Sequence, residues 1–230
     1  MCLPGAQEFT PFTATVLETA YNRSGEVVRR NSIVQAVRSD ASTVRAQTIE
    51  GPDKKSHAEQ RFIVDLAARE EVAIDGFTET LTTSPIRLAI VAARQRPEPC
   101  TGDPLRTVML GYEVTHEVVN IGAPSKTRLI REEHWRAPAL GCFSLKTVLF
   151  VGPNEANLHL AKIDEVKTVV PGEPAAALFA RPSGFTERSP MQRRQEFNKR
   201  FPDRPCPTCL MQGDAEADAV YYERQGDRGR

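Results

Sequence analysis

The chain has 230 residues, enough for one domain with a full hydrophobic core or for two small ones. Its 30 basic and 30 acidic residues cancel, so it lacks the net positive field expected of a nucleic-acid-binding protein. No stretch approaches the run of about 18 apolar residues that a transmembrane helix needs. The 17 prolines and 14 glycines indicate many turns and few long helices.

Apolar residues at alternate positions, bounded by turn residues, predict extended strands through the first third of the chain. After a lead-in at 1–8 that we expect to be disordered, the pattern predicts strands at 9–20, 27–38, 43–49, 60–66 and 70–74. Asp75-Gly76 is typical of a two-residue hairpin turn, with a return strand at 77–83. Polar residues at alternate positions imply that one face of this sheet contacts water.

The pattern changes at Ser84-Pro85, which is typical of a helix start. Apolar residues at Ile86, Ile90 and Ala93 have helical spacing, so we predict a helix at 85–95 that the following prolines end. Four further antiparallel strands are predicted within 106–185. The fold class is therefore mainly β (α+β): a curved antiparallel sheet, or half-barrel, with one covering helix.

The end of the chain is more charged than the rest. Pro190 is predicted to start a short exposed helix, and the polar sequence beyond 201 is expected to be disordered. This gives a β domain at 9–187 and a charged tail at 188–230. The excess of basic residues at 181–204 fits a solvated helix face better than a surface for an anionic membrane or a nucleic acid, because aromatic residues are few.

Two pairs of cysteines are candidates for disulfides. Cys100 and Cys142 both lie next to turn residues, 42 positions apart. They form either a disulfide that stabilises the fold or two unconnected thiols, with Cys142 buried. Cys206 and Cys209 form a CPTC motif without the strand and helix of a redox site, so a local disulfide or an inert tail is expected.

The histidines and acidic residues do not form a recognisable catalytic or metal-binding motif. His116 and His134 fall on consecutive predicted strands and would have to face each other to act together. Glu132 and Glu133 are neighbours in one strand, so their side chains point to opposite faces. An enzyme would require convergence in a pocket of two or three residues from the set His116, His134, Glu113, Glu133 and His159. We expect none, and we predict no catalytic residue, metal or cofactor.

The second half of the chain carries a series of motifs that resembles a known group of proteins. These motifs are Trp135, the turn Ala137-Pro138-Ala139-Leu140, and a closing stretch with Gly172-Glu173-Pro174, Leu178-Phe179 and Pro182-Ser183-Gly184-Phe185. They resemble a group of uncharacterised secreted proteins from acidobacteria, over about residues 9–190. That group is similar in architecture to the LolA/LppX-type half-barrels, which include outer-membrane lipoprotein carriers.

The resemblance implies export, so we expect a periplasmic or secreted protein whose start codon has been misassigned. It carries no catalytic residues to this chain. A non-catalytic role is expected, in the first case the binding of a lipid or another apolar ligand in the concave face of the sheet. The alternative is interaction with envelope proteins by a scaffold whose own side chains fill its core. In the first case the expected lining is Val108, Leu110, Tyr112, Val114, Leu145, Leu149, Leu158, Leu160 and Ile90. In the closing stretch, Leu178 and Phe179 are expected to cover the end of the sheet.

Overall fold

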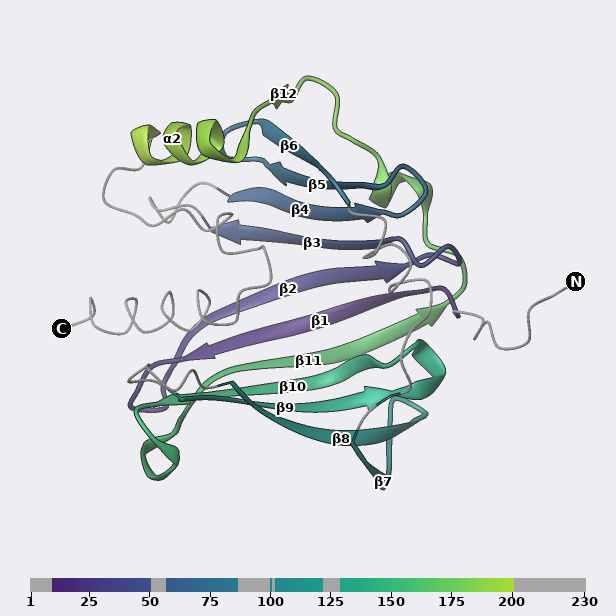
Figure 1. Cartoon of the computed structure of the whole chain (residues 1–230), viewed down its shortest axis with the longest axis vertical. Helices are drawn as coiled ribbons and strands as arrows, with labels where there is room; N and C mark the ends of the chain where they lie inside the picture. Colours follow the sequence, from purple (N-terminus) through teal and green to yellow (C-terminus); the bar gives the residue numbers. More distant parts are fainter. Residues whose placement is uncertain (1–9, 51–56, 87–99, 101, 122–128, 201–230) are drawn as a thin grey trace, which may run out of the picture. The chain divides into compact units, whose positions relative to one another are not determined.

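The protein is mainly β, as the alternation of apolar residues predicts (Figure 1). The computed structural model describes residues 10–50, 57–86, 100, 102–121 and 129–200. Within these ranges the strands follow the hydrogen-bonded order β12-β6-β5-β4-β3-β2-β1-β11-β10-β9-β8-β7. The predicted lead-in, the predicted helix beyond residue 86 with Ile90, and the tail with Cys206 and Cys209 lie outside the described residues. The predicted half-barrel curvature stays a prediction.

The described residues fall into two compact units. The first contains residues 10–14, 33–50, 57–86 and 169–200, and the second contains residues 15–32, 100, 102–121 and 129–168. Three strands contribute to both units: β1 (Phe12–Tyr21), β2 (Val27–Val37) and β11 (His159–Pro171).

In the first unit, a ladder of antiparallel strands runs from β2 to β6. After β2 come β3 (Thr43–Glu50), β4 (His57–Asp65), β5 (Glu70–Asp75) and β6 (Thr80–Pro85). The short β12 (Thr186–Glu187) pairs with β6 in parallel. The register places Val44 opposite Ile63 and Ile63 opposite Val72, so apolar residues of successive strands share one face.

Two sequence predictions in this unit are wrong. Asp75-Gly76 is not a two-residue hairpin turn, because Asp75 pairs with Thr80 and residues 76–79 form the connection. The Asp75 carboxylate accepts a hydrogen bond from the Phe77 N–H at 2.9 Å, and this contact favours the longer turn. The helix predicted from residue 85 does not start there, because Ser84 and Pro85 are the last residues of β6. Pro85 is tolerated at a strand end, where its missing N–H costs nothing in the ladder.

The apolar face of the first unit is covered by residues 172–188, which we call the closing segment. Its residues Leu178, Phe179 and Phe185 pack against a cluster of buried residues made of Ala36, Val44, Ile63, Val72, Ile74 and Leu81. Leu178 and Phe179 belong to the 3-10 turn η3 (Ala176–Phe179). Leu178 and Phe179 therefore contact the apolar face of the sheet, and the expectation that they cover its end stays a prediction.

Polar contacts along its length hold the closing segment in place. The Ser39 N–H donates to the Glu173 carboxylate at 3.2 Å, and the Arg38 guanidinium lies 3.9 Å from the centre of the Phe179 ring. Arg61 Nη1 donates to three backbone carbonyls at 3.1–3.2 Å, those of residues 177, 178 and 180. The Arg61 guanidinium thus supplies hydrogen-bond donors to backbone carbonyls of a turn that does not pair with a neighbouring strand.

The second unit contains a meander of five strands, where four were predicted. They are β7 (Asp103–Met109), β8 (Tyr112–Ile121), β9 (Leu129–Ala137), β10 (Phe143–Gly152) and β11. The 3-10 turns η1 (Pro138–Leu140) and η2 (Glu155–Asn157) connect β9 to β10 and β10 to β11. Adjacent strands of the meander are antiparallel, as expected, and Ile130, Leu149, Val151 and Ala161 form a buried apolar cluster.

The predicted C-terminal helix is confirmed as α2 (Pro190–Arg200). Ser189 precedes Pro190 and its hydroxyl accepts from the Gln192 N–H at 3.2 Å. The Gln192 side chain accepts in return from the Ser189 N–H at 2.9 Å. This reciprocal pair is a capping box, and with proline at the first helical position it explains why the helix begins where it does.

The contacts of Arg61 predict a specific loss of stability. Replacing Arg61 by Ala should lower the free energy of unfolding by about 2 kcal/mol, since it removes hydrogen bonds from a charged donor to three carbonyls. Arg30→Ala on β2, an exposed residue, is the matched control and should change little. Urea unfolding measures both. Equal stability of the Arg61→Ala variant and the wild type would contradict this role.

Candidate functional site

The apolar residues predicted to line a ligand cavity do not lie on one face of the second unit. Leu149 is opposite Glu132, whereas Val114 lies on the other face, which it shares with His116 and Trp135. Leu145 and Val114 are buried, but Val108 and Leu110 are 62% and 47% exposed, and Tyr112, Leu158 and Leu160 are half-buried. Apolar ligand binding by these residues stays a prediction, and the described residues do not bring them together as one lining.

One face of the second unit instead carries a concentration of charged side chains, which we call the charged face. The register places Glu117 opposite His134, His134 opposite Thr147, and Thr147 opposite Asp164. Leu149, two residues after Thr147, lies on the same face. Its partners on the neighbouring strands are Glu132 of β9 and Lys162 of β11. On the other side of His134, the Arg136 guanidinium lies 3.0 Å from the Glu117 carboxylate.

His134 and Glu132 form the centre of the charged face. His134 Nε2 lies 3.0 Å from Glu132 Oε2, and His134 Nδ1 lies 3.3 Å from Thr147 Oγ1. The hydrogen bond from His134 holds the pKa of Glu132 below its usual value, against the opposing effect of burial. The positive charges of His134, Lys162 and Arg136 lower this pKa further, so the electrostatics link β9 to β11.

A second group of charges continues the charged face onto β1 and β2. Glu18 is only 4% exposed, and its Oε1 accepts from Arg29 at 2.7 Å and from Asn31 at 3.1 Å. Lys162 Nζ lies 3.8 Å from Glu18 and 3.2 Å from Asp164. Because a buried carboxylate is costly without partners, these contacts explain how Glu18 remains within the sheet.

The geometry around His134 contains the elements of a catalytic triad. Glu132 orients the imidazole, and both Thr147 Oγ1 and Ser144 Oγ lie near Nδ1, at 3.3 and 3.5 Å. However, Thr147 pairs with both β9 and β11, so the backbone around it belongs to the ladder. Donors for a developing oxyanion must be free and aimed at the reacting atom. The arrangement is therefore better suited to holding charges in fixed positions.

The opposite face of the same strands carries a separate set of contacts. The rings of His116 and Trp135 have their centres 4.6 Å apart, and Lys146 Nζ lies 5.0 Å from the centre of a Trp135 ring. Arg131 pairs with Glu133 at 2.6 Å. The prediction that Glu132 and Glu133 point to opposite faces is confirmed, because Glu132 faces Leu149 and Glu133 faces Val148.

His116 and His134 do not face each other. β8 and β9 are adjacent, but His116 lies opposite Trp135 and Glu117 lies opposite His134, so the two imidazoles are on different faces. The residue set that an enzyme would have needed is thereby divided: His116 contacts Glu133 at 3.5 Å, and His134 contacts Glu132. Within the described ranges, no three His, Cys, Asp or Glu side chains are placed to hold a metal ion.

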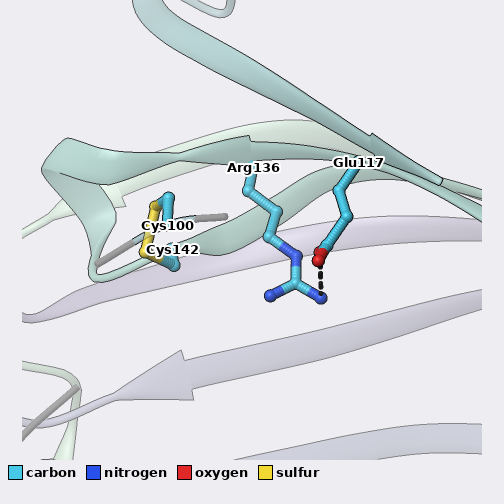
Figure 2. The surroundings of a disulfide bond; sticks show 4 residues. All are labelled: Cys100, Glu117, Arg136 and Cys142. Atoms are coloured by element: carbon cyan, nitrogen blue, oxygen red, sulfur yellow. Dashed lines mark ion pairs between the residues drawn. A yellow bond between two sulfur atoms is a disulfide. The ribbon is translucent and has the colours of Figure 1, made fainter. Parts of the chain in front are cut away.

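A disulfide joins Cys100 to Cys142, as one of the two sequence alternatives predicts (Figure 2). It links the segment before β7 to the turn after η1, and the Arg136–Glu117 ion pair lies beside it in the figure. Gly102 lies close to the same region with φ +113°, and a Cβ there would come within 2.5 Å of the His116 carbonyl oxygen. Glycine at 102 thus lets the start of β7 approach β8 closely, while the disulfide ties the segment before β7 to the turn before β10.

Most of the charged face could not be predicted from the sequence, although part of its signal is visible there. Alternate residues of β9 are Glu132, His134 and Arg136, a polar row on one face of a strand. Their partners Glu18 and Lys162 come from strands more than a hundred residues apart, so only the strand order brings them together.

Comparisons with known proteins give little further information. No known protein family and no curated protein matches the chain. Among solved structures, the chain is similar to MucB in complex with MucA(peri), with 17% identity and a TM-score of 0.34, covering 77% of this chain and 56% of that one. It is also similar to MucB alone, with 16% identity and a TM-score of 0.34, covering 79% and 60%. The chain thus spans less than two thirds of the chains it matches. A likeness at this level carries no argument, so the resemblance to acidobacterial secreted proteins and to LolA-type carriers stays a prediction.

The disulfide should contribute a large part of the stability. Replacing both Cys100 and Cys142 by Ser should lower the free energy of unfolding by about 3–4 kcal/mol, because the closed loop restricts the unfolded chain. Denaturant unfolding of oxidised wild type and variant measures this. Reductant should destabilise the wild type by a similar amount and leave the variant unaffected. Free thiols at both positions in the oxidised protein would show that the link does not form.

The depressed pKa of Glu132 predicts a pH dependence with a definite sign. Because this pKa is lower in the folded than in the unfolded chain, Glu132 stabilises the fold above its usual pKa, and this contribution is lost as pH falls through the lowered value. Glu132→Gln should therefore be less stable than wild type at neutral pH, with the difference shrinking to nothing in acid. Glu113→Gln, at an exposed position of β8, is the control. A difference that stays constant with pH would contradict this assignment.

Proposed function

We propose that the protein is exported and acts by binding a polar, charged partner on the charged face, without catalysis. The observation that carries this proposal is the alternation of acidic and basic side chains on one face of β8 and β9, where Glu117, Glu132, His134 and Arg136 are half-buried, with the buried Lys162 of β11 beside them. A surface with both signs of charge suits a protein segment with complementary charges, and such complementarity gives specificity and register.

A lipid is a poorer ligand for this face than a protein segment. An acyl chain laid over Glu132 and Arg136 would remove water from them and return no hydrogen bond, which is costly for any charge. Of the residues predicted to line an apolar cavity, Leu149 shares this face with Glu132 and Lys162, while Val114 does not. We therefore favour the protein-interaction alternative over the apolar ligand.

The disulfide supports export. Disulfides persist in oxidising compartments such as the periplasm or the cell exterior and are rare where thiols are kept reduced. The Cys100–Cys142 bond supports a location of this kind. No helix in the described part of the chain combines the length and the apolar character of a membrane span.

Photo-cross-linking from two neighbouring positions of β8 tests the proposed surface. Val119 lies opposite Glu132 on the charged face, and Val118 lies opposite Glu133 on the other face. A photoreactive amino acid at 119 should give a discrete protein adduct in an envelope extract of the source organism, and the same group at 118 should not. Arg136→Gln should reduce the adduct, as should raised salt concentration, because the attraction is electrostatic.

Three results would contradict this proposal. Adducts of equal yield from positions 118 and 119 would show that the face is not selective. An adduct with the mass of a lipid would favour the apolar ligand. Turnover of an ester or peptide substrate that is lost in His134→Gln would show that the pair of Glu132 and His134 acts in catalysis.

A further inference from the structure

Four polar residues lie in a line across the first unit, on the face opposite its apolar cluster. Gln47 pairs with Gln60, Gln60 with Asp75, and Asp75 with Thr80, so one residue from each of β3, β4, β5 and β6 stands in the same row. Thr82, two positions after Thr80, belongs to the same face. We call these five residues the polar row.

Four residues of the polar row are buried, and Gln47 is half-buried. Gln60 and Asp75 have no exposed surface, and Thr80 and Thr82 are 2% and 3% exposed. At such burial each donor and acceptor needs a hydrogen-bond partner from the protein, an ordered water or a ligand, because bulk water does not reach it.

The hydrogen bonds of the polar row divide it into two parts. Asp75 Oδ1 accepts from the Phe77 N–H, and the hydroxyls of Thr80 and Thr78 lie 2.7 Å apart, so these residues serve the turn at 76–79. Gln60 is different: neither its Nε2 nor its Oε1 has a partner. Gln47 Oε1 and Thr82 Oγ1 also lack partners. Each such group costs about 1–3 kcal/mol, so the free protein holds unused hydrogen-bonding capacity here.

We propose that the polar row is a binding site for a neutral ligand that carries an amide group. The unpartnered atoms are a carboxamide donor and acceptor on Gln60, a further acceptor on Gln47 and a hydroxyl on Thr82. An amide carries both an N–H donor and a C=O acceptor, which are the chemical complements of the unpartnered Oε1 and Nε2 atoms in this row. The Asp75 carboxylate in the same row disfavours an anionic ligand. This site belongs to the first unit and does not depend on the charged face.

The amide can come from a peptide or from an N-acetylated sugar. The burial of Gln60 affects the rate at which either ligand binds. Because Gln60 has no exposed surface, a ligand enters only when the covering atoms separate. We therefore expect association slower than for an open surface, with slow exchange in NMR spectra. The two sources are distinguished by using N-acetyl-alanine-methylamide and N-acetylglucosamine as separate probes.

The test compares binding and stability in matched variants. Side-chain amide signals of ¹⁵N-labelled wild-type protein are followed during titration with each probe, and the Gln60 signal is assigned by its loss in Gln60→Leu. We expect the Gln60 signal to shift with one of the probes. Binding should weaken by about tenfold in Gln60→Leu, which corresponds to the loss of one or two neutral hydrogen bonds. Gln35→Leu, at a half-buried position of β2, should bind as wild type.

Stability distinguishes a ligand site from a structural one. If Gln60 is kept for a ligand, Gln60→Leu should unfold at the same denaturant concentration as wild type or at a higher one, since no hydrogen bond is lost in the free protein. Thr82→Val, which removes the Thr82 hydroxyl with little change of shape, should behave in the same way. A lower unfolding midpoint in both variants would overturn the proposal. It would also be overturned if neither probe shifts the Gln60 signal and this signal shows contact with bound water.

Discussion

The antiparallel register of β8 to β11 is the constraint on which the second unit depends. It places Glu117 opposite His134 and Glu132 one row further along the same face. A shift of a single residue would move every side chain of a strand to the other face and would leave Glu132 and Lys162 without opposite charges. The charges and the register therefore support each other: the pairs stabilise one alignment, and that alignment keeps partly buried carboxylates beside cations.

The two units deal with buried polar groups in different ways. In the second unit, Glu18 and Lys162 are almost fully buried but lie in a network of mutual contacts. In the first unit, the apolar face is covered by the closing segment, while Gln60 on the other face is buried without a partner. A paired charge is explained by folding alone. An unpaired buried amide is not, because an apolar side chain of similar size would cost less, and the proposed ligand would explain why it is kept.

The sequence predicted the architecture better than the candidate sites. Alternation and turn residues were sufficient for the strands, and Pro190 with its preceding serine was sufficient for α2, because these are local effects. The connection at 76–79 was missed because the Asp75 side chain stabilises a longer turn than the dipeptide suggests. Pro85 was taken as a helix start, although a proline also fits the end of a strand.

The sites depend on contacts that a single sequence does not contain. Lys162 and Glu18 meet because β11 and β1 are neighbours in the sheet, and the polar row forms because four strands align Gln47, Gln60, Asp75 and Thr80. The apolar residues chosen as a ligand lining were selected by alternation without regard to which face each strand presents, so Val114 and Leu149 fall on opposite sides.

The register of β8 against β9 is the most direct point at which to test this account. Interstrand NOE contacts in isotopically labelled protein report which backbone protons lie opposite one another. The account predicts contacts between Glu117 and His134 and between Val119 and Glu132. Contacts between His116 and His134 would instead indicate a register displaced by one residue, which would separate the charged residues and contradict the proposed binding surface.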